Sequence, residues 1–286
     1  MMIFKKIVWV GALLGTGLAQ AFAPQTGTWI VTSEVNGKPG RGLAIDVQDN
    51  TLVMQMYAYD ASGNATFYMT SGPLANDRYS APLNKYRGGR YLGSGELSGK
   101  EDGSAGTVSM RFVSGTKGYI TLPGEAEKEI SRFNFAYGND RDGLKGIWLF
   151  SAANSLTPTA DFFRLEKAAP ATQYGNGVIV SSDGSMACEQ QVSGNAAGTV
   201  VCAKVSSTGR VLRGYQFVYS VNEGEGNLVT STGQVTSIAA MRRLANRTDI
   251  GTGILLKSES SEEAASTQVN PDQLRSAIES IAQQVD

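Results

Sequence analysis

The chain of 286 residues contains no histidine. This absence excludes Ser-His-Asp and Cys-His nucleophilic sites, together with the zinc sites that combine histidine with cysteine. Carboxylate pairs, Ser-Lys dyads and calcium sites remain open. Charged residues are also few, at 18%, and the net charge is −1, so the chain lacks the basic surface that proteins use to bind nucleic acid. The composition therefore predicts a protein without a nucleic-acid partner, and no motif indicates a cofactor.

Cysteine is nearly as scarce, since the chain has only Cys188 and Cys202. A metal site or a reactive thiol would need histidine or further cysteine partners, which the sequence does not supply. Residues 193–195, Ser-Gly-Asn, are typical of a turn, which would let the two cysteines face each other across a hairpin. In an oxidising compartment this sole pair predicts a disulfide, which would stabilise the fold by about 3 kcal/mol.

The apolar stretch at residues 7–18 is shorter than the ~20 residues that span a bilayer. It follows two lysines and precedes small residues, which is the order of a secretory signal peptide. Because Pro24 would hinder cleavage just before it, we predict cleavage after Ala21. Residues 1–21 are then a signal peptide, and the mature protein is periplasmic or secreted, with no transmembrane segment and no lipid anchor. An uncleaved membrane anchor is the alternative.

Glycine is abundant, at 34 residues, and it punctuates short apolar-polar alternations. Residues 107–112 show the alternation clearly, with one apolar and one polar face, as in a β-strand. Strand-like runs of this kind fill residues 24–137 and, after a polar stretch, residues 144–257. We therefore predict an all-β protein with two tandem antiparallel modules, each a small barrel or sandwich, the second carrying the disulfide hairpin. The Gly-x-Trp sequences at 27–29 and 146–148 suggest a diverged repeat.

The C-terminal residues differ in composition. Residues 258–269 are rich in Ser, Glu and Ala and predict a linker. Residues 270–286 predict an amphipathic helix, with an N-terminal cap and a proline in the first turn. Its apolar stripe includes Leu274, Ile278, Ile281 and Val285. This stripe is predicted to dock, on the protein's own modules, on a second copy or in a partner's groove. A membrane surface is disfavoured, because the polar face lacks Lys and Arg.

Four aromatic residues surround the turn-like residues 60–63, namely Tyr57, Tyr59, Phe67 and Tyr68. Tyrosine offers a flat apolar face with a polar tip, so such a cluster is suited to stacking a sugar or an apolar ligand. Cross-strand aromatic pairs also stabilise sheets in the absence of any ligand. The four residues are the candidate ligand-binding site, although the pattern by itself favours the structural role.

Carboxylates fall near the predicted turns of both modules. They are Glu34, Asp46, Asp49, Asp60, Glu96, Asp161, Asp183, Glu189, Glu223 and Glu225. A glycosidase needs two acids at a fixed separation, and the sequence alone does not pair any of these. Residues 222–226 offer oxygens for calcium without the EF-hand spacing.

Arg132 and Arg243 each precede an apolar residue in the last strand-like run of a module. We hypothesise that each arginine closes its module, by pairing with a carboxylate or by packing over Trp29 or Trp148.

Several short motifs carry a resemblance to a known group. The motifs are Gly27-Thr28-Trp29, Gly40-Arg41-Gly42, residues 57–63 (YAYDASG), Phe67-Tyr68, residues 71–74 (SGPL) and Arg132-Phe133. Over residues 27–135 the chain resembles a module of hypothetical exported proteins from β- and γ-proteobacteria, in which Phe67 is more often Trp. The second module resembles a companion found in some of the same proteins. The resemblance implies export and a β-rich fold, and it brings no known activity or catalytic residues.

Together these features predict an exported, non-catalytic β-protein that binds a ligand or partner at the cell envelope, such as a glycan or an envelope protein. One alternative is a carboxylate-based hydrolase acting on a glycan or another polymer. Another is a structural or assembly factor of surface machinery.

Overall fold

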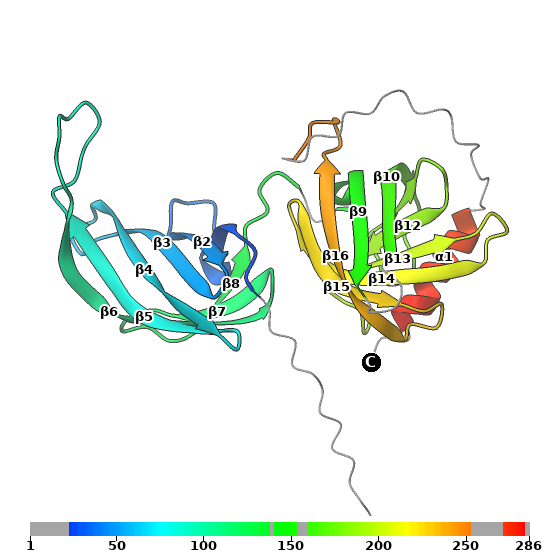
Figure 1. Cartoon of the computed structure of the whole chain (residues 1–286), viewed down its shortest axis with the longest axis horizontal. Helices are drawn as coiled ribbons and strands as arrows, with labels where there is room; N and C mark the ends of the chain where they lie inside the picture. Colours follow the sequence, from blue (N-terminus) through cyan, green and yellow to red (C-terminus); the bar gives the residue numbers. More distant parts are fainter. Residues whose placement is uncertain (1–22, 138–139, 154–158, 253–270, 284–286) are drawn as a thin grey trace, which may run out of the picture.

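The computed structural model describes residues 23–137, 140–153, 159–252 and 271–283. Within these ranges the chain forms two closed antiparallel β-barrels followed by one helix (Figure 1). This confirms the predicted fold class and decides for barrels over sandwiches. The predicted signal peptide (1–21) and linker (258–269) lie outside the described residues.

The first barrel is an up-and-down meander within residues 23–137. Its strands are β1 (Gly27–Val31), β2 (Gly42–Gln48), β3 (Thr51–Tyr59), β4 (Ala65–Ala75), β5 (Arg78–Arg87), β6 (Lys100–Ser114), β7 (Lys117–Thr121) and β8 (Lys128–Arg132). A short 3₁₀ helix, η1 (Thr32–Glu34), follows β1. Each strand pairs with the next, and β8 pairs with β1, so the barrel has no free sheet edge.

The second barrel repeats this plan within residues 140–252. Its strands are β9 (Gly146–Ala153), β10 (Thr159–Ala169), β11 (Val178–Ser181), β12 (Met186–Gln190), β13 (Val200–Val205), β14 (Val211–Ser220), β15 (Glu223–Val229) and β16 (Val235–Ala245). The 3₁₀ helix η2 (Arg141–Leu144) precedes β9, and β16 pairs with β9 to close the barrel. Cys188 and Cys202 face each other across β12 and β13 with their sulfurs 2.00 Å apart, as predicted.

Alternation along the strands fills the barrel interiors. In β3, for example, Leu52, Met54 and Met56 are buried while the intervening side chains are more exposed. Trp29 is fully buried in the same core, with its ring 5.8 Å from that of Phe112. A barrel of this strand number is just wide enough for side chains to fill. The side chains of the first barrel that can contact a ligand are therefore those on its outer wall.

Arg243 closes the second barrel as hypothesised. Its guanidinium carbon lies 4.2 Å from the Trp148 ring centre and 4.3 Å from that of Tyr137. Its nitrogens donate to the carbonyl oxygens of Val221, Lys145 and Gly143. Burial lowers the pKa of Arg243 to about 10, which still leaves it charged at neutral pH.

Arg132 closes the first barrel differently. It donates to the carbonyl oxygens of Thr28 (2.7 Å) and Phe133 (3.3 Å), so backbone acceptors replace the predicted carboxylate or ring. Its guanidinium fills the space where a side chain on Gly27 would lie. A side chain on Gly146 would meet the Ala245 carbonyl oxygen first and then the Arg243 guanidinium. Both glycines have φ near +130° (134° and 131°), which other residues rarely adopt. The Gly-x-Trp sequence and the distant arginine thus form one unit in each barrel.

The C-terminal helix α1 (Pro271–Gln283) lies on the outer face of β12 to β14. Leu274, Ile278 and Ile281 are buried there against side chains such as Val201 and Val178. Of the predicted docking modes, the structure shows these three side chains docked on the protein's own second barrel. A partner-docking role would require the helix to leave the barrel. Val285 lies outside the described residues.

Of the helices described, none is long and apolar enough to cross a membrane.

Replacing Arg243 by alanine should lower the free energy of unfolding by about 3 kcal/mol, because buried carbonyl oxygens lose their donor. Arg243→Lys should recover only part of this loss, because an ammonium cannot reproduce the planar donor geometry or the stacking. Denaturant unfolding of both variants measures the effect. Arg247→Ala, at an exposed position after β16, is the control and should stay within about 0.5 kcal/mol of the wild type. An Arg243→Ala variant as stable as this control would refute the closing role.

Candidate functional site

One end of the first barrel gathers four connections. Because consecutive strands run antiparallel, the β1–β2, β3–β4, β5–β6 and β7–β8 connections all lie at this end. We call it the hairpin end, after the long β5–β6 hairpin that projects beyond the barrel (Figure 1). The chain enters the barrel at Gly27 and leaves it at Arg132, at the opposite end.

Exposed aromatic side chains cluster on the outer wall near the hairpin end. Tyr57 and Tyr59 of β3, Phe67 of β4 and Tyr86 of β5 are 56%, 50%, 44% and 36% exposed. Tyr57 and Phe67 are direct cross-strand partners, and the Phe67 and Tyr86 rings are parallel with centres 6.0 Å apart. We call these four side chains the aromatic platform. They form a row across three neighbouring strands, with Tyr59 adjoining it.

The platform contains three of the four predicted ligand-binding residues. Tyr68 is the exception, because strand alternation turns it inward, where it packs on the core of the first barrel. Tyr86 takes its place. The sequence does contain a signal that leads to Tyr86, because Asn76-Asp77 is typical of a two-residue hairpin turn. In the structure both residues have positive φ, as such a turn requires. Counting outward from that turn pairs Phe67 with Tyr86.

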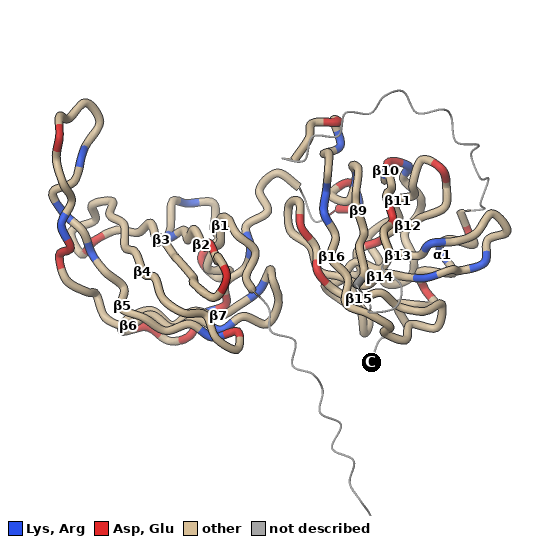
Figure 2. The backbone as a smooth tube through the Cα atoms, viewed as in Figure 1, with Lys and Arg blue, Asp and Glu red and all other residues tan. Residues whose placement is uncertain are grey.

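Three of the four platform side chains lie on strands without charged residues. Neither β3 nor β4 contains a charged residue, and both appear without charge colouring in Figure 2. Gln55 lies on the same face of β3 as Tyr57, and Asn84 on the same face of β5 as Tyr86. The first charge in the platform row is Glu101 of β6, which pairs with Tyr86. The surface thus offers aromatic faces, phenol hydroxyls and amides to a ligand, with charge only at its β5–β6 edge, where Lys85 and Arg87 flank Tyr86 and Glu101 pairs with it.

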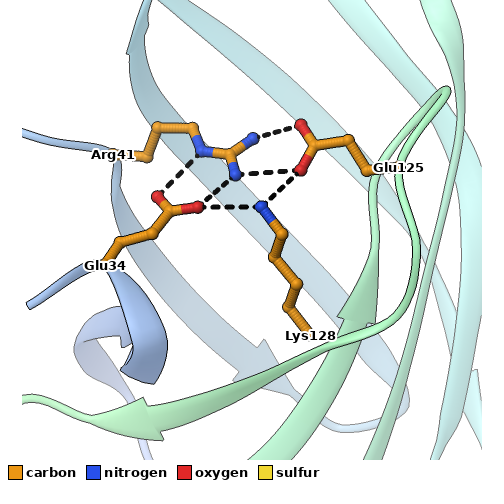
Figure 3. Close-up of polar contacts among 4 residues, drawn as sticks. All are labelled: Glu34, Arg41, Glu125 and Lys128. Atoms are coloured by element: carbon orange, nitrogen blue, oxygen red, sulfur yellow. Dashed lines mark hydrogen bonds and ion pairs between the residues drawn. The ribbon is translucent and has the colours of Figure 1, made fainter.

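A ring of four charged side chains joins two connections at the hairpin end (Figure 3). Arg41 bonds to both Glu34 and Glu125, with one nitrogen-oxygen distance of 3.0 Å to each. Lys128 lies 3.0 Å from Glu34 and 2.7 Å from Glu125. The two acids therefore alternate with the two cations in a closed ring, which fastens the β1–β2 connection to the β7–β8 connection.

The ring shifts the ionisation of its members. Hydrogen bonds from Arg41 and then Lys128 lower the pKa of the Glu125 carboxyl to about 2. Arg41 also lowers the pKa of Glu34, which outweighs the opposing effect of burial. The two carboxylates in turn raise the pKa values of Arg41 and Lys128. All four groups are charged at neutral pH, so the ring carries no net charge and contributes to structure instead of attracting an ion.

The Glu125 contribution to stability should depend on pH. Its folded-state pKa of about 2 lies below the usual 4.5, so the contribution is full above pH 4.5 and disappears as the pH falls toward 2. Since the ring is partly exposed, we expect Glu125→Gln to lower the free energy of unfolding by about 1 kcal/mol at pH 7. Urea unfolding at several pH values measures this, with Glu96→Gln, on the exposed hairpin, as the control. A difference from wild type that persisted unchanged at pH 2 would contradict the assignment.

The predicted carboxylates of the second barrel are held by protein donors. Asp161 is buried and accepts bonds from Lys204 (2.6 Å), Arg213 (2.8 Å) and the Tyr215 hydroxyl (2.6 Å). Burial raises the pKa of Asp161, but these bonds together outweigh it, and the pKa lies below its ordinary value. An acid fixed in its ionised form is unsuited to donate a proton in catalysis.

Glu189 is also fully buried and accepts bonds from Thr172, Gly177 and Gln191. These donors hold the β10–β11 connection against β12. Asp60 and Asp183 each accept backbone N–H groups of their own turns. These carboxylates have structural partners, as turn caps and internal acceptors usually do.

Residues 222–226, considered above for calcium, lie where the two barrels meet. Glu225 accepts a bond from the Gly115 backbone of the first barrel, and Glu223 forms an ion pair with Arg242. Burial raises the pKa of Glu225. The described part of the chain contains no group of three His, Cys, Asp or Glu residues placed to hold a metal ion.

No protein-family model matches the sequence, and neither a curated protein nor a solved structure shows significant similarity to it. The structure describes a protein with two β-barrels, of which the first carries the aromatic platform. Any functional assignment has to come from the chemistry of that site.

Proposed function

We propose that this is an exported, non-catalytic binding protein of the bacterial envelope, whose first barrel binds an uncharged carbohydrate through the aromatic platform. The observation that carries the proposal is the gathering of four exposed aromatic side chains, three of them on the uncharged strands β3 and β4 and the fourth, Tyr86, on the neighbouring strand β5. Export is supported by the signal-like order of residues 1–21.

Aromatic rings suit carbohydrate because both have apolar faces and polar edges. Tyr57, Tyr59, Phe67 and Tyr86 present ring surface, and their strands add the Gln55 and Asn84 amides for hydrogen bonds to sugar hydroxyls. An anionic polymer would meet no cation on β3 or β4, and the two cations beside Tyr86 on β5 lie next to the acids Glu101 and Asp102 of β6, with Arg87 and Asp102 in an ion pair. The chemistry of the surface therefore favours a neutral sugar over an acidic one.

The structural alternative assigns the platform to sheet stability alone. A cross-strand aromatic pair contributes roughly 0.2–1 kcal/mol, which is small in a barrel already closed by β1–β8 pairing. Clusters of exposed apolar side chains on soluble proteins more often mark contact sites. Binding is also favoured over hydrolysis, because Asp161, Glu189 and Glu225 already have protein partners.

The triple variant Tyr57→Ala, Tyr59→Ala, Phe67→Ala should abolish carbohydrate binding while the barrels stay folded. Affinity gel electrophoresis with dextran, laminarin, galactomannan and the anionic polymer alginate measures binding. We expect the wild-type protein to bind at least one neutral polymer, and the triple variant to bind it at least tenfold more weakly, since each lost ring removes stacking worth about 1 kcal/mol.

Phe162→Ala is the matched control, since Phe162 is 55% exposed on β10 of the second barrel. It should bind as the wild type does. Three results would each contradict the proposal: no retardation by any neutral polymer, stronger retardation by alginate, or unchanged binding by the triple variant.

A further inference from the structure

The β5–β6 hairpin carries exposed apolar side chains that contribute nothing to either core. Tyr91 is 72% exposed, Leu92 is fully exposed and Leu97 is 47% exposed. The tip is nonetheless a defined turn, since the Ser94 backbone N–H donates to the Tyr91 carbonyl oxygen at 2.9 Å and Ser94 Oγ accepts from the Tyr91 N–H at 3.2 Å. Tyr91 and Leu92 are therefore held at the outer corner of a turn, and no residue in the described part of the chain covers them.

The hairpin continues the strand that carries part of the platform. Tyr86 precedes residues 88–99 directly, and Arg87 pairs with Lys100 where the hairpin leaves the barrel. At about 3.3 Å per residue, Tyr91 lies at most about 16 Å from Tyr86 along the chain. The hairpin extends beyond β5 and β6 at the end of the barrel where the platform lies, and Figure 1 shows this extension.

The charge of the hairpin restricts what binds there. Residues 88–99 contain one cation, Arg90, and one acid, Glu96, so the segment has no net charge. Insertion into an anionic membrane surface would call for an excess of cations. The cations at the base of the hairpin, Arg87 and Lys100, are offset by Glu101 and Asp102, and Arg87 forms an ion pair with Asp102 at 2.9 Å. The hairpin shares with β3 and β4 the combination of ring surface and absent net charge, which fits the same neutral ligand.

We propose that the hairpin tip, Tyr91 and Leu92, is a second contact site for the ligand of the platform, so that the protein selects extended polysaccharide chains over short oligosaccharides. This inference rests on the proposed function. A chain that occupies the platform presents its next units to the tip at high effective concentration, so the second contact adds affinity that a short ligand does not obtain.

The test compares one neutral sugar at two lengths, a disaccharide and the polymer of the same unit, with the full chain. The variant is Tyr91→Ala, Leu92→Ala, and Ser98→Ala, also exposed on the hairpin, is its control. We expect the wild-type protein to bind the polymer far more tightly than the disaccharide. The tip variant should lose about tenfold in polymer affinity and nothing in disaccharide affinity. Because these side chains are exposed, the fold should be unaffected.

The failure of this inference differs from the failure of the proposed function. If the platform variant loses polymer binding while the tip variant binds the polymer as tightly as Ser98→Ala does, the tip is no contact site and the platform assignment stands. If the platform variant binds normally, the function itself is wrong. Sedimentation with phosphatidylglycerol vesicles completes the test. If the wild-type protein binds the vesicles, and the tip variant loses this binding but keeps its polymer affinity, the tip contacts a membrane and the inference is wrong.

Discussion

The pairing of the last strand with the first is the constraint on which each barrel depends. Without the β1–β8 and β9–β16 ladders, each sheet would expose two edges whose N–H and C=O groups invite association with other chains. Closure also decides what the side chains do. Every strand then has one face toward a filled core and one toward solvent, so the inward side chains pack the interior and only the outward side chains can contact a ligand.

The two barrels secure this closure with related devices. In both, a glycine at positive φ on the first strand makes room for the last strand. Gly27 makes room for the Arg132 guanidinium, and Gly146 for the Ala245 carbonyl oxygen, with Arg243 next to it. The arginines find different partners. Arg243 is sandwiched against aromatic rings, whereas Arg132 relies on backbone carbonyls. The first barrel adds the ion-pair ring of Figure 3 at its other end, where two connections would otherwise be joined only through their strands.

Local patterns predicted much of this structure. Period-2 alternation and glycine turns gave the two β-modules, and the turn between Cys188 and Cys202 gave the disulfide, because these signals act over neighbouring residues. Barrel closure was not predictable in the same way, since β1 and β8 meet across about a hundred residues. The site illustrates both cases. Tyr57, Tyr59 and Phe67 lie beside one turn, and alternation alone places Phe67 and Tyr68 on opposite faces of their strand, with Tyr68 toward the core. Tyr86 joins the platform only through the register set at Asn76-Asp77.

The distribution of charge connects the fold to the proposed function. Several charged groups lie at the ends of the barrels. Glu125 joins two connections, Arg243 binds backbone carbonyls where the second barrel closes, and Asp161 pairs with Lys204. The long strands β3 and β4 carry none. Charge on an outer wall keeps a protein from associating with itself, so two uncharged strands that expose three aromatic rings, with a fourth on β5, carry a risk of association that the proposed ligand contact would explain. Because Trp29 and Phe112 help fill the interior, the proposed ligand is one that lies along the outer wall. A polymer meets this geometry better than a small molecule, which would leave most of the platform uncovered.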